Sequence, residues 1–411
     1  MAGERRPGLW PALLGCFVCQ MGLGFGYVFG VVLKHIVAEF DWSRTAFAAG
    51  SAPLLLSMAL SAPLVGVALE RFGARVVLSA ATLLLGVSLE LFARIESLWH
   101  FYAVCALFGL ALTGLGDVAV GAVASRWVQG RRGLTLGFVF VGSNLGGALV
   151  PLVAGAVASA DSWRSALHVL AVGSVVWVLP FALFAVREPP ALVAETRGDA
   201  APTGAGEPSL DLAEAVRTRS FWILALTLLA FYLYYLAVNQ HLVAFLSDAG
   251  FSDARAAASL SFAVALGIAS KLAIGWLADR IPVKRALQLN FAVLTAGSFL
   301  LLVVPFSGTL VVFLVAHGAT TAAENVLLPL AIGESFGVAH IARIYGVLMI
   351  ALFPGGVLGP VLAGVAFDSL GSYRPAFMGF AVLNLLALLG LAGLRNERER
   401  TSGTAERPGE D

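Results

Sequence analysis

The sequence predicts an all-α membrane protein with twelve transmembrane helices in two six-helix halves that repeat each other. Three observations predict this fold class. The 411-residue chain is 59% hydrophobic and only 12% charged, it divides into twelve long apolar runs, and motifs of the first half recur in the second. A soluble domain carries about 25% charged residues, so the composition excludes an ordinary soluble protein.

The apolar runs have the length that a membrane requires. A hydrocarbon core of about 30 Å needs roughly 20 apolar residues per helix. The runs do not alternate apolar and polar residues, so a β-barrel is not expected. The predicted spans lie near 10–33, 47–69, 76–93, 101–125, 133–158, 165–186, 220–246, 256–277, 286–304, 309–333, 343–366 and 375–394.

The composition changes between the sixth and seventh runs. The segment 187–219 is rich in Pro, Gly, Ala and charged residues, as an exposed linker is. We therefore expect an N-terminal half over 1–186 and a C-terminal half over 220–394. The tail 395–411 is polar, has no apolar periodicity and is predicted to be disordered.

Lys and Arg are distributed unevenly between the two sides of the predicted bundle. Nineteen of the 26 fall at the termini, in the linker and in the loops on the same side, and six fall in the loops of the other side. The remaining one, Lys271, lies in the middle of a predicted helix. Because basic residues favour cytoplasmic segments, both termini and the linker are predicted to be cytoplasmic.

The two halves carry a matching charged turn. GVALERFGAR at 66–75 and GWLADRIPVK at 275–284 are offset by 209 residues, and the same offset relates Pro151 to Pro360. The turn charges can bridge helix ends, and we expect a gating latch that opens when the halves move. Alternatively, they only anchor the topology. The predicted latch residues are Glu70, Arg71, Arg75, Asp279, Arg280 and Lys284.

Three charged side chains lie well inside predicted helices, away from the helix ends: Asp117, Lys271 and Glu324. An ionised group at a helix centre costs roughly 2.5 to 3.5 kcal/mol, so such residues pair, face a cavity or mark a pathway. All three lie about six to eight residues from the cytoplasmic helix ends, on the order of 10 Å, and could share one layer. With two acids and one lysine, we expect one carboxyl group to hold a proton.

Several further stretches are informative together. They are FDWSR at 40–44, RWVQGRRGLTLG at 126–137, SKLAIGWLADR at 270–280, IYGVLM at 344–349 and GGVLGPVLAGVAFDSLGSYRPAF at 355–377. The chain resembles the monocarboxylate transporter family and its bacterial oxalate/formate-antiporter-like relatives, a branch of the major facilitator superfamily. The resemblance covers nearly the whole chain and implies a bacterial-type member in the inner membrane.

The eighth helix departs from that family. The resemblance implies an arginine there that binds the substrate carboxylate, four residues before the glycine of the turn, but this sequence has Lys271. Some members place an acidic partner one turn earlier, where this chain has Gly267. Lys offers a point charge where Arg offers a planar fork. An anion site is therefore expected, whereas the family's substrate is not carried over.

These features predict a secondary active transporter that moves a small, monocarboxylate-like organic anion by alternating access with proton coupling. Lys271 would be the substrate counter-ion, and Asp117 and Glu324 would carry protons. Further substrate-binding residues are expected at Asn144, Tyr235, Asn239 and Asn325. Two alternatives stay open: the three charges form a structural triad that only neutralises itself, and Asn144 joins helices instead of binding substrate.

Other functions are less well supported. A proton-driven exporter of cationic or zwitterionic compounds is the alternative, because two acids outnumber one lysine. The chain has no HExxH, GxSxG, phosphate-binding loop or paired CxxC motif, so we expect no enzyme, metal or cofactor. The expected partners are the substrate, protons and the lipid bilayer, without nucleic acid, and we expect a functional monomer.

Overall fold

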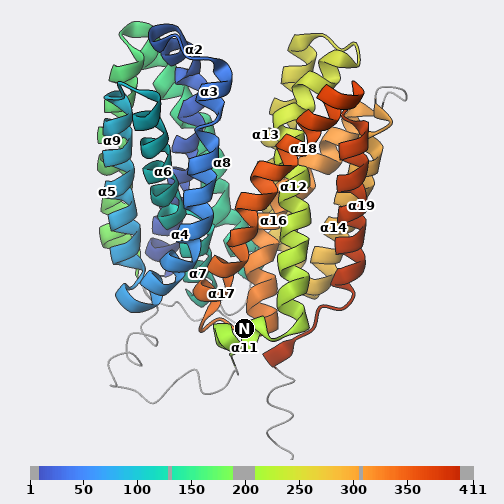
Figure 1. Cartoon of the computed structure of the whole chain (residues 1–411). Coiled ribbons are helices and arrows are strands. Elements are labelled where there is room, and N and C mark those ends of the chain that lie inside the picture. Colours follow the sequence, from blue (N-terminus) through green and yellow to red (C-terminus); the bar gives the residue numbers. More distant parts are fainter. Residues whose placement is uncertain (1–8, 128–131, 188–208, 305–308, 399–411) are drawn as a thin grey trace, which may run out of the picture. The chain divides into compact units, whose positions relative to one another are not determined.

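The computed structural model describes residues 9–127, 132–187, 209–304 and 309–398. Within these ranges the chain is helical and contains no β-strand, which confirms the all-α fold class. By its contacts the chain divides into two compact units. The first comprises Met1–Gln129 and Phe138–Glu207, and the second comprises Gly130–Gly137 and Pro208–Asp411. Each unit is a bundle of long helices (Figure 1).

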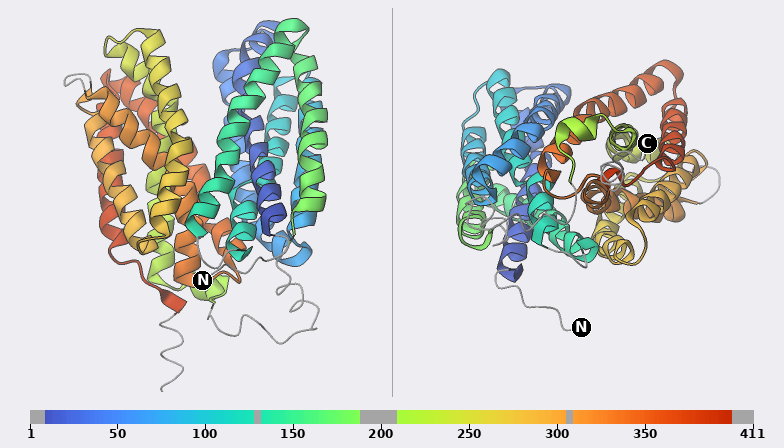
Figure 2. Two further views of the ribbon diagram at one scale, coloured as in Figure 1. Left: turned by 180° about the vertical axis from the view of Figure 1, so that it is seen from behind. Right: turned by 90° about the horizontal axis from the view of Figure 1, so that it is seen from below.

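The first unit contains the helices of the N-terminal half and most of α8. Its long helices run side by side, as the two views of Figure 2 show. The elements are α1 (Leu9–Met21), η1 (Gly22–Tyr27), α2 (Val28–Phe40), α3 (Arg44–Ala48), α4 (Ser51–Phe72), α5 (Ala74–Ala93), α6 (Leu98–Leu115), α7 (Asp117–Trp127), α8 (Arg132–Ala160), α9 (Trp163–Pro180) and η2 (Phe181–Ala185).

The second unit has the same kind of architecture. Its helices α12 and α18, α13 and α16, and α14 and α16 pack against each other, and α19 packs against α12 and α14. The elements are α11 (Leu212–Val216), α12 (Arg219–Asp248), α13 (Asp253–Ala278), α14 (Val283–Leu301), α16 (Leu310–Phe336), α17 (Ile341–Leu348), η3 (Met349–Ala351), α18 (Leu352–Leu370) and α19 (Arg374–Leu391).

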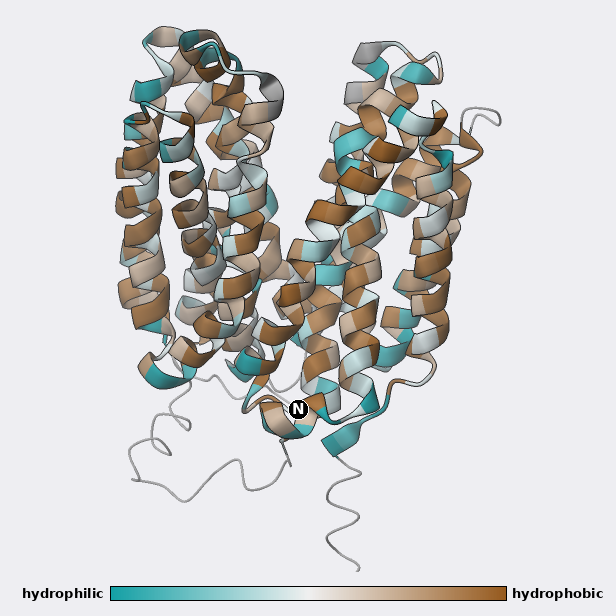
Figure 3. Cartoon of the chain, viewed as in Figure 1, coloured by the Kyte–Doolittle hydropathy of each residue, from teal (hydrophilic) through white to brown (hydrophobic). Residues whose placement is uncertain are grey.

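Eleven helical stretches of the described residues are long and apolar enough to cross a membrane. Hydrophobic residues dominate the long helices of both units (Figure 3). The predicted ninth span, α14, has 19 residues but is less apolar, because it has Lys284 and Arg285 in its first turn and carries Gln288 and Asn290. It packs against α16 and α19, so together with the eleven stretches it makes twelve long helices in the described residues.

Two interruptions lie in the first and fourth predicted spans. The first divides at η1, whose sequence GLGFGY is rich in glycine. A Cβ on Gly24 would lie 2.1 Å from the carbonyl carbon of Gly146, so only glycine permits this approach to α8. The fourth span ends a helix at Gly116, whose backbone is extended (φ −82°, ψ −165°). Asp117 therefore begins a new helix, α7, instead of lying inside one.

The 209-residue repeat is visible in the helix packing of each unit. In the first unit, a Cβ on Gly109 would lie 2.4 Å from the carbonyl oxygen of Leu54, where α6 meets α4. In the second unit, a Cβ on Gly318 would lie 2.3 Å from the carbonyl oxygen of Ala263, where α16 meets α13. Both residues of the second contact are offset by 209 from those of the first. Both units thus use the same close backbone contact.

Most of the predicted linker (188–208) and of the predicted tail (399–411) lies outside the described residues. The described end of the linker includes α11, which begins with a capping box formed by Asp211 and Glu214. After α19, the Glu397 carboxylate accepts a hydrogen bond from the Ser220 hydroxyl at 2.5 Å. The N–H of Leu210 donates to the carbonyl oxygen of Phe336, at the end of α16, at 2.8 Å, so both segments are attached to helix ends of the second unit.

Candidate functional site

A polar pair lies where α1 meets α7 in the first unit. Gln20, in the last turn of α1, is completely buried, and its Nε2 donates to Oδ1 of Asp117 at 2.6 Å. Asp117 is half-buried and starts α7, so it lies at the positive end of a helix dipole, which favours a carboxylate. Helix breaks of this kind form substrate and ion sites in transporters.

Asn144 lies in the part of α8 that packs against α1. A Cβ added to Gly142 would lie 2.3 Å from the carbonyl oxygen of Phe17, and a Cβ added to Gly146 would lie 2.1 Å from the carbonyl oxygen of Met21. Asn144 is two residues from each glycine, or about 200° around the helix, so its side chain points away from this contact. The Asn144 side chain is half-buried.

In the second unit, Lys271 and Glu324 are buried on helices that pack along each other. Their exposed fractions are 3% and 2%. The helices α13 and α16 meet at Ala263 and Gly318, and the Ser270 hydroxyl donates to the carbonyl oxygen of Ala319. Burying a charged group costs free energy unless it is paired or hydrogen-bonded. Two such groups on adjoining helices make this the most strongly charged buried region that the structure describes.

The Glu324 carboxyl group contacts a third helix. Asn290, on α14 and 4% exposed, directs its Nδ2 to Oε2 of Glu324 at 3.4 Å and to the carbonyl oxygen of Thr320 at 3.3 Å. An amide donor can bond a carboxylate and also the carbonyl oxygen of a protonated carboxyl group. Asn290 therefore fits Glu324 in either protonation state.

The other predicted residues of the second unit are half-buried. Tyr235 stacks on Phe231 at 5.3 Å between ring centroids and on His317 at 6.5 Å. Asn239 donates from Nδ2 to the carbonyl oxygen of Tyr235 at 3.0 Å. Asn325 follows Glu324 on α16. The predicted layer of Asp117, Lys271 and Glu324 combines residues of both units and stays a prediction.

The charged turn of the second unit makes a helix cap. Asp279, which ends α13, accepts hydrogen bonds from the backbone N–H of Gly133 at 2.7 Å and of Leu134 at 3.0 Å. Gly133 and Leu134 belong to the segment that groups with the second unit. The Asp279 carboxylate satisfies two backbone donors at the start of α8, where negative charge is stabilising.

The basic residues of the latch also contact backbone carbonyl groups. Arg280 donates to the carbonyl oxygen of Trp276 at 2.9 Å, and its guanidinium lies 3.7 Å from the centroid of that indole ring. Lys284 donates from Nζ to the carbonyl oxygens of Ala392 and Leu394 at 2.7 and 2.8 Å. These bonds fix the end of α13 and the segment after α19.

In the first unit, the corresponding turn depends on Gly73. Its φ of +77° is a conformation that favours glycine. The guanidinium of Arg71 lies 5.2 Å from the ring centroid of Phe72. Arg75 is exposed and Glu70 is half-buried.

Sequence reasoning missed Gln20, Asn290 and His317. All three are buried polar side chains inside apolar helices. A signal for His317 was present, because His317, Thr320 and Glu324 are spaced i, i+3 and i+7 and share one helix face. Asn290 and Gln20 offered no comparable signal, since a single amide in an apolar run does not show what it faces.

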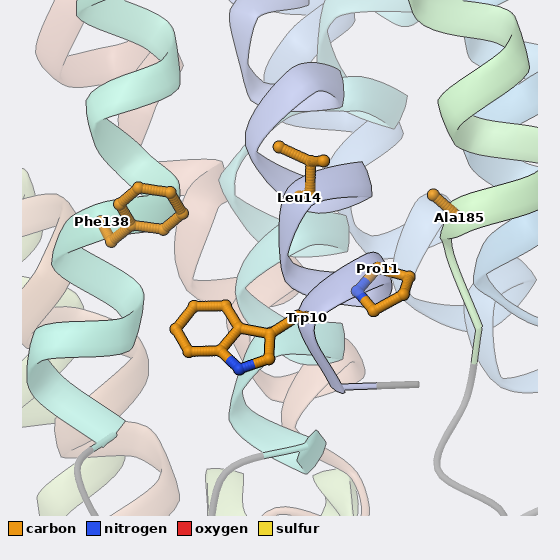
Figure 4. Close-up of a pocket in the computed structure, with 5 residues that line it drawn as sticks. All are labelled: Trp10, Pro11, Leu14, Phe138 and Ala185. Carbon is orange, nitrogen blue, oxygen red and sulfur yellow. The ribbon is translucent and has the colours of Figure 1, made fainter. Parts of the chain in front are cut away.

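A cavity of about 430 Å³ lies elsewhere in the first unit. It is lined by Trp10, Pro11 and Leu14 of α1, Phe138 of α8 and Ala185 of η2 (Figure 4). The lining is apolar and includes none of the predicted site residues. Among the described residues, no group of three or more His, Cys, Asp or Glu side chains could hold a metal ion.

Comparisons with known proteins agree on one family. The family model described as Major Facilitator Superfamily matches residues 12–315 and 275–410. Monocarboxylate transporter 13 of Rattus norvegicus is 29% identical over 90% of this chain and 85% of that protein. The uncharacterized MFS-type transporter YhjX of Escherichia coli is 25% identical over 85% and 86%. The hexuronate transporter of Bacillus subtilis is 23% identical over 79% and 80%.

Solved structures show the same fold. The proton:xylose symporter XylE matches with a TM-score of 0.72 and 14% identity over 96% of this chain and 99% of its own. The human organic anion transporter MFSD10 matches with a TM-score of 0.68 and 16% identity, over 95% and 100%. At these identities the likeness supports the fold alone.

Proposed function

Because the chain belongs to the Major Facilitator Superfamily, whose members are secondary transporters, we propose that it carries a small, monocarboxylate-like organic anion together with protons. The observation that supports this most strongly is Lys271. It is 3% exposed on α13, and no other Lys or Arg side chain in the described part of the chain is buried. A buried ammonium group is a natural counter-ion for a carboxylate.

The proposed cycle follows from the charges. The substrate carboxylate pairs with Lys271 while Glu324 and Asp117 hold protons, so the loaded site is neutral. Release of the anion and of a proton lets Lys271 pair with a carboxylate of the chain, which neutralises the empty carrier. A neutral state at both stages lowers the cost of moving the site across the low-dielectric interior.

The names of the relatives support the substrate class. Monocarboxylate transporter 13 and the hexuronate transporter are named for carboxylate compounds, and XylE is described as a proton symporter. We extend the proposal to location: a multi-pass protein of a bacterial inner membrane with both termini in the cytoplasm. The supporting observation is the nineteen-to-six distribution of basic residues.

Transport by the purified protein in liposomes tests the proposal. Accumulation of labelled pyruvate, lactate and a panel of small carboxylates is measured with and without an imposed pH gradient. We expect at least one carboxylate to accumulate, and its accumulation to require the gradient. A labelled amine panel in the same vesicles is the control. Gradient-driven movement of amines, with no carboxylate transported, would instead support the exporter.

A further inference from the structure

A column of buried polar side chains runs through the core of the second unit beside Glu324. On α16 it comprises Glu324, Thr320 and His317, all 2% exposed. Glu324 and His317 are seven residues apart on one face of the helix, or about 10 Å along its axis. The proposed substrate site uses only the Glu324 end of this column.

Neighbouring helices continue the column by direct contacts. Asn290 of α14 reaches Glu324 at 3.4 Å. Eight residues later on α14, Ser298 accepts a hydrogen bond from Nδ2 of Asn384, on α19, at 3.0 Å. The Tyr234 hydroxyl of α12 lies 3.0 Å from Nδ1 of His317 and also interacts with the Ser298 side chain. Four helices therefore contribute buried polar side chains, in one cluster around Glu324 and a second around His317, on the same face of α16.

Three oxygen atoms of this region have no protein partner. Oγ1 of Thr227, Oγ1 of Thr295 and Oδ1 of Asn384 form no hydrogen bond with any described residue. Their residues are 2%, 5% and 0% exposed. Buried polar atoms in native proteins are nearly always satisfied, by ordered water where protein groups are lacking.

The residues that carry these atoms lie on the same helices as members of the column. Thr295 is one helical turn from Ser298, Thr227 is two turns from Tyr234 on the same face of α12, and Asn384 already bonds Ser298. A network that only clamped helices together would be stronger with every partner satisfied. Open acceptor positions beside hydroxyl groups are what a hydrated path requires.

We propose that this column is the proton route of the second unit, joining His317 to Glu324 through the hydroxyl groups of Tyr234, Ser298 and Thr295 and through water. The proposal rests on the proton coupling proposed above. A proton taken up at His317 leaves along the column, where each hydroxyl or water accepts one proton and gives up another. The last proton binds the Glu324 carboxylate, and His317 returns to its neutral form.

The ionisable groups around this route are few. Lys271 is buried on α13, which packs along α16, and its backbone contacts Gly137 at the start of α8. Tyr234 and Tyr235 contact the His317 ring from α12. The buried side chains of α14 and α19 are neutral. Arg343 and Tyr345 lie on α17, which begins near the C-terminal end of α16, away from His317.

A pH jump followed by infrared spectroscopy tests the route without a substrate. The full chain in lipid is moved rapidly between alkaline and acidic buffer, and the carboxyl band that disappears in Glu324→Gln reports protonation of Glu324. Tyr234→Phe keeps the ring and removes the hydroxyl, and Asn384→Leu removes the neighbouring amide. We expect each variant to slow protonation of Glu324 by about tenfold or more.

Ser259→Ala is the matched control. Ser259 is also buried on a helix of this unit, and its hydroxyl donates to the carbonyl oxygen of Arg255. In Ser259→Ala, protonation of Glu324 should be as fast as in the wild type. Unchanged rates in both Tyr234→Phe and Asn384→Leu, with the Glu324 band intact, would overturn the route and leave the proposed coupling standing. If the wild type has no band sensitive to Glu324→Gln, both proposals fail.

Discussion

At the scale of single residues, Lys271 is the strongest test of the substrate class. Lys271→Gln should fold, because Glu324 can remain neutral by holding a proton, and it should lose carboxylate binding. Lys271→Arg keeps the charge and should retain part of the carboxylate binding. The measurement is thermal stabilisation of purified protein by a carboxylate that the wild type transports. A ligand at 100 times its dissociation constant stabilises by about 2.7 kcal/mol.

An equal stabilisation of wild type and Lys271→Gln by the same carboxylate would remove the counter-ion role. The three intramembrane charges would then be better explained as a structural triad. Lys284→Gln provides the comparison, since Lys284 binds backbone carbonyl groups at a helix end and should not affect carboxylate affinity.

Glu324 tests the proton coupling at the same scale. Glu324→Gln keeps the shape of the side chain and can still bond Asn290, which lies 3.4 Å from it, but it cannot bind and release a proton. Exchange of labelled substrate between equal concentrations should survive, while accumulation driven by a pH gradient should be lost. Asp117→Asn should act in the same direction. Glu334→Gln, also on α16, is the control, and gradient-driven accumulation that persists in Glu324→Gln would exclude this residue from coupling.

At the scale of helices, the packing of α13 against α16 depends on Gly318. A Cβ there would lie 2.3 Å from a backbone carbonyl oxygen, so Gly318→Ala must separate the helices and should destabilise by about 1–3 kcal/mol. Gly379→Ala, on α19 in the same unit, meets no atom within 4 Å and should be neutral or stabilising. Thermal unfolding in detergent compares the two. Equal melting temperatures would show that the contact is not close.

Asp279 tests the latch. Its two oxygens accept hydrogen bonds from Gly133 and Leu134 at 2.7 and 3.0 Å. Asp279→Asn removes the negative charge and one acceptor from the start of α8. We expect slower transport with little change in substrate affinity, because Asp279 is eight residues along α13 from Lys271. A large loss of equilibrium binding, at an unchanged exchange rate, would count against the latch.

The sequence predicted helices better than it predicted their interruptions. Long apolar runs identify spans directly, and an offset of 209 residues predicts that the halves repeat, as the paired contacts of Gly109 and Gly318 show. The break at Gly116 was missed because glycine in an apolar run indicates close packing as well as a break. The contacts of Asn290 with Glu324 and of Tyr234 with His317 join residues far apart in the chain. They depend on the relative position of packed helices, which periodicity alone does not give.

At the scale of the whole molecule, the uneven distribution of basic residues predicts the orientation in the membrane. Single cysteines introduced at Gly204, in the linker, and at Glu96, between α5 and α6, should be labelled from opposite sides of the membrane. Glu96 is exposed and is preferable to its neighbour Ser97, whose side chain caps α6. The native cysteines Cys16, Cys19 and Cys105 are buried, so the unmodified chain should give little background. We expect an impermeant maleimide to label the Glu96 position in intact cells and the Gly204 position only after permeabilisation, whereas labelling of Gly204 from outside would invert the topology.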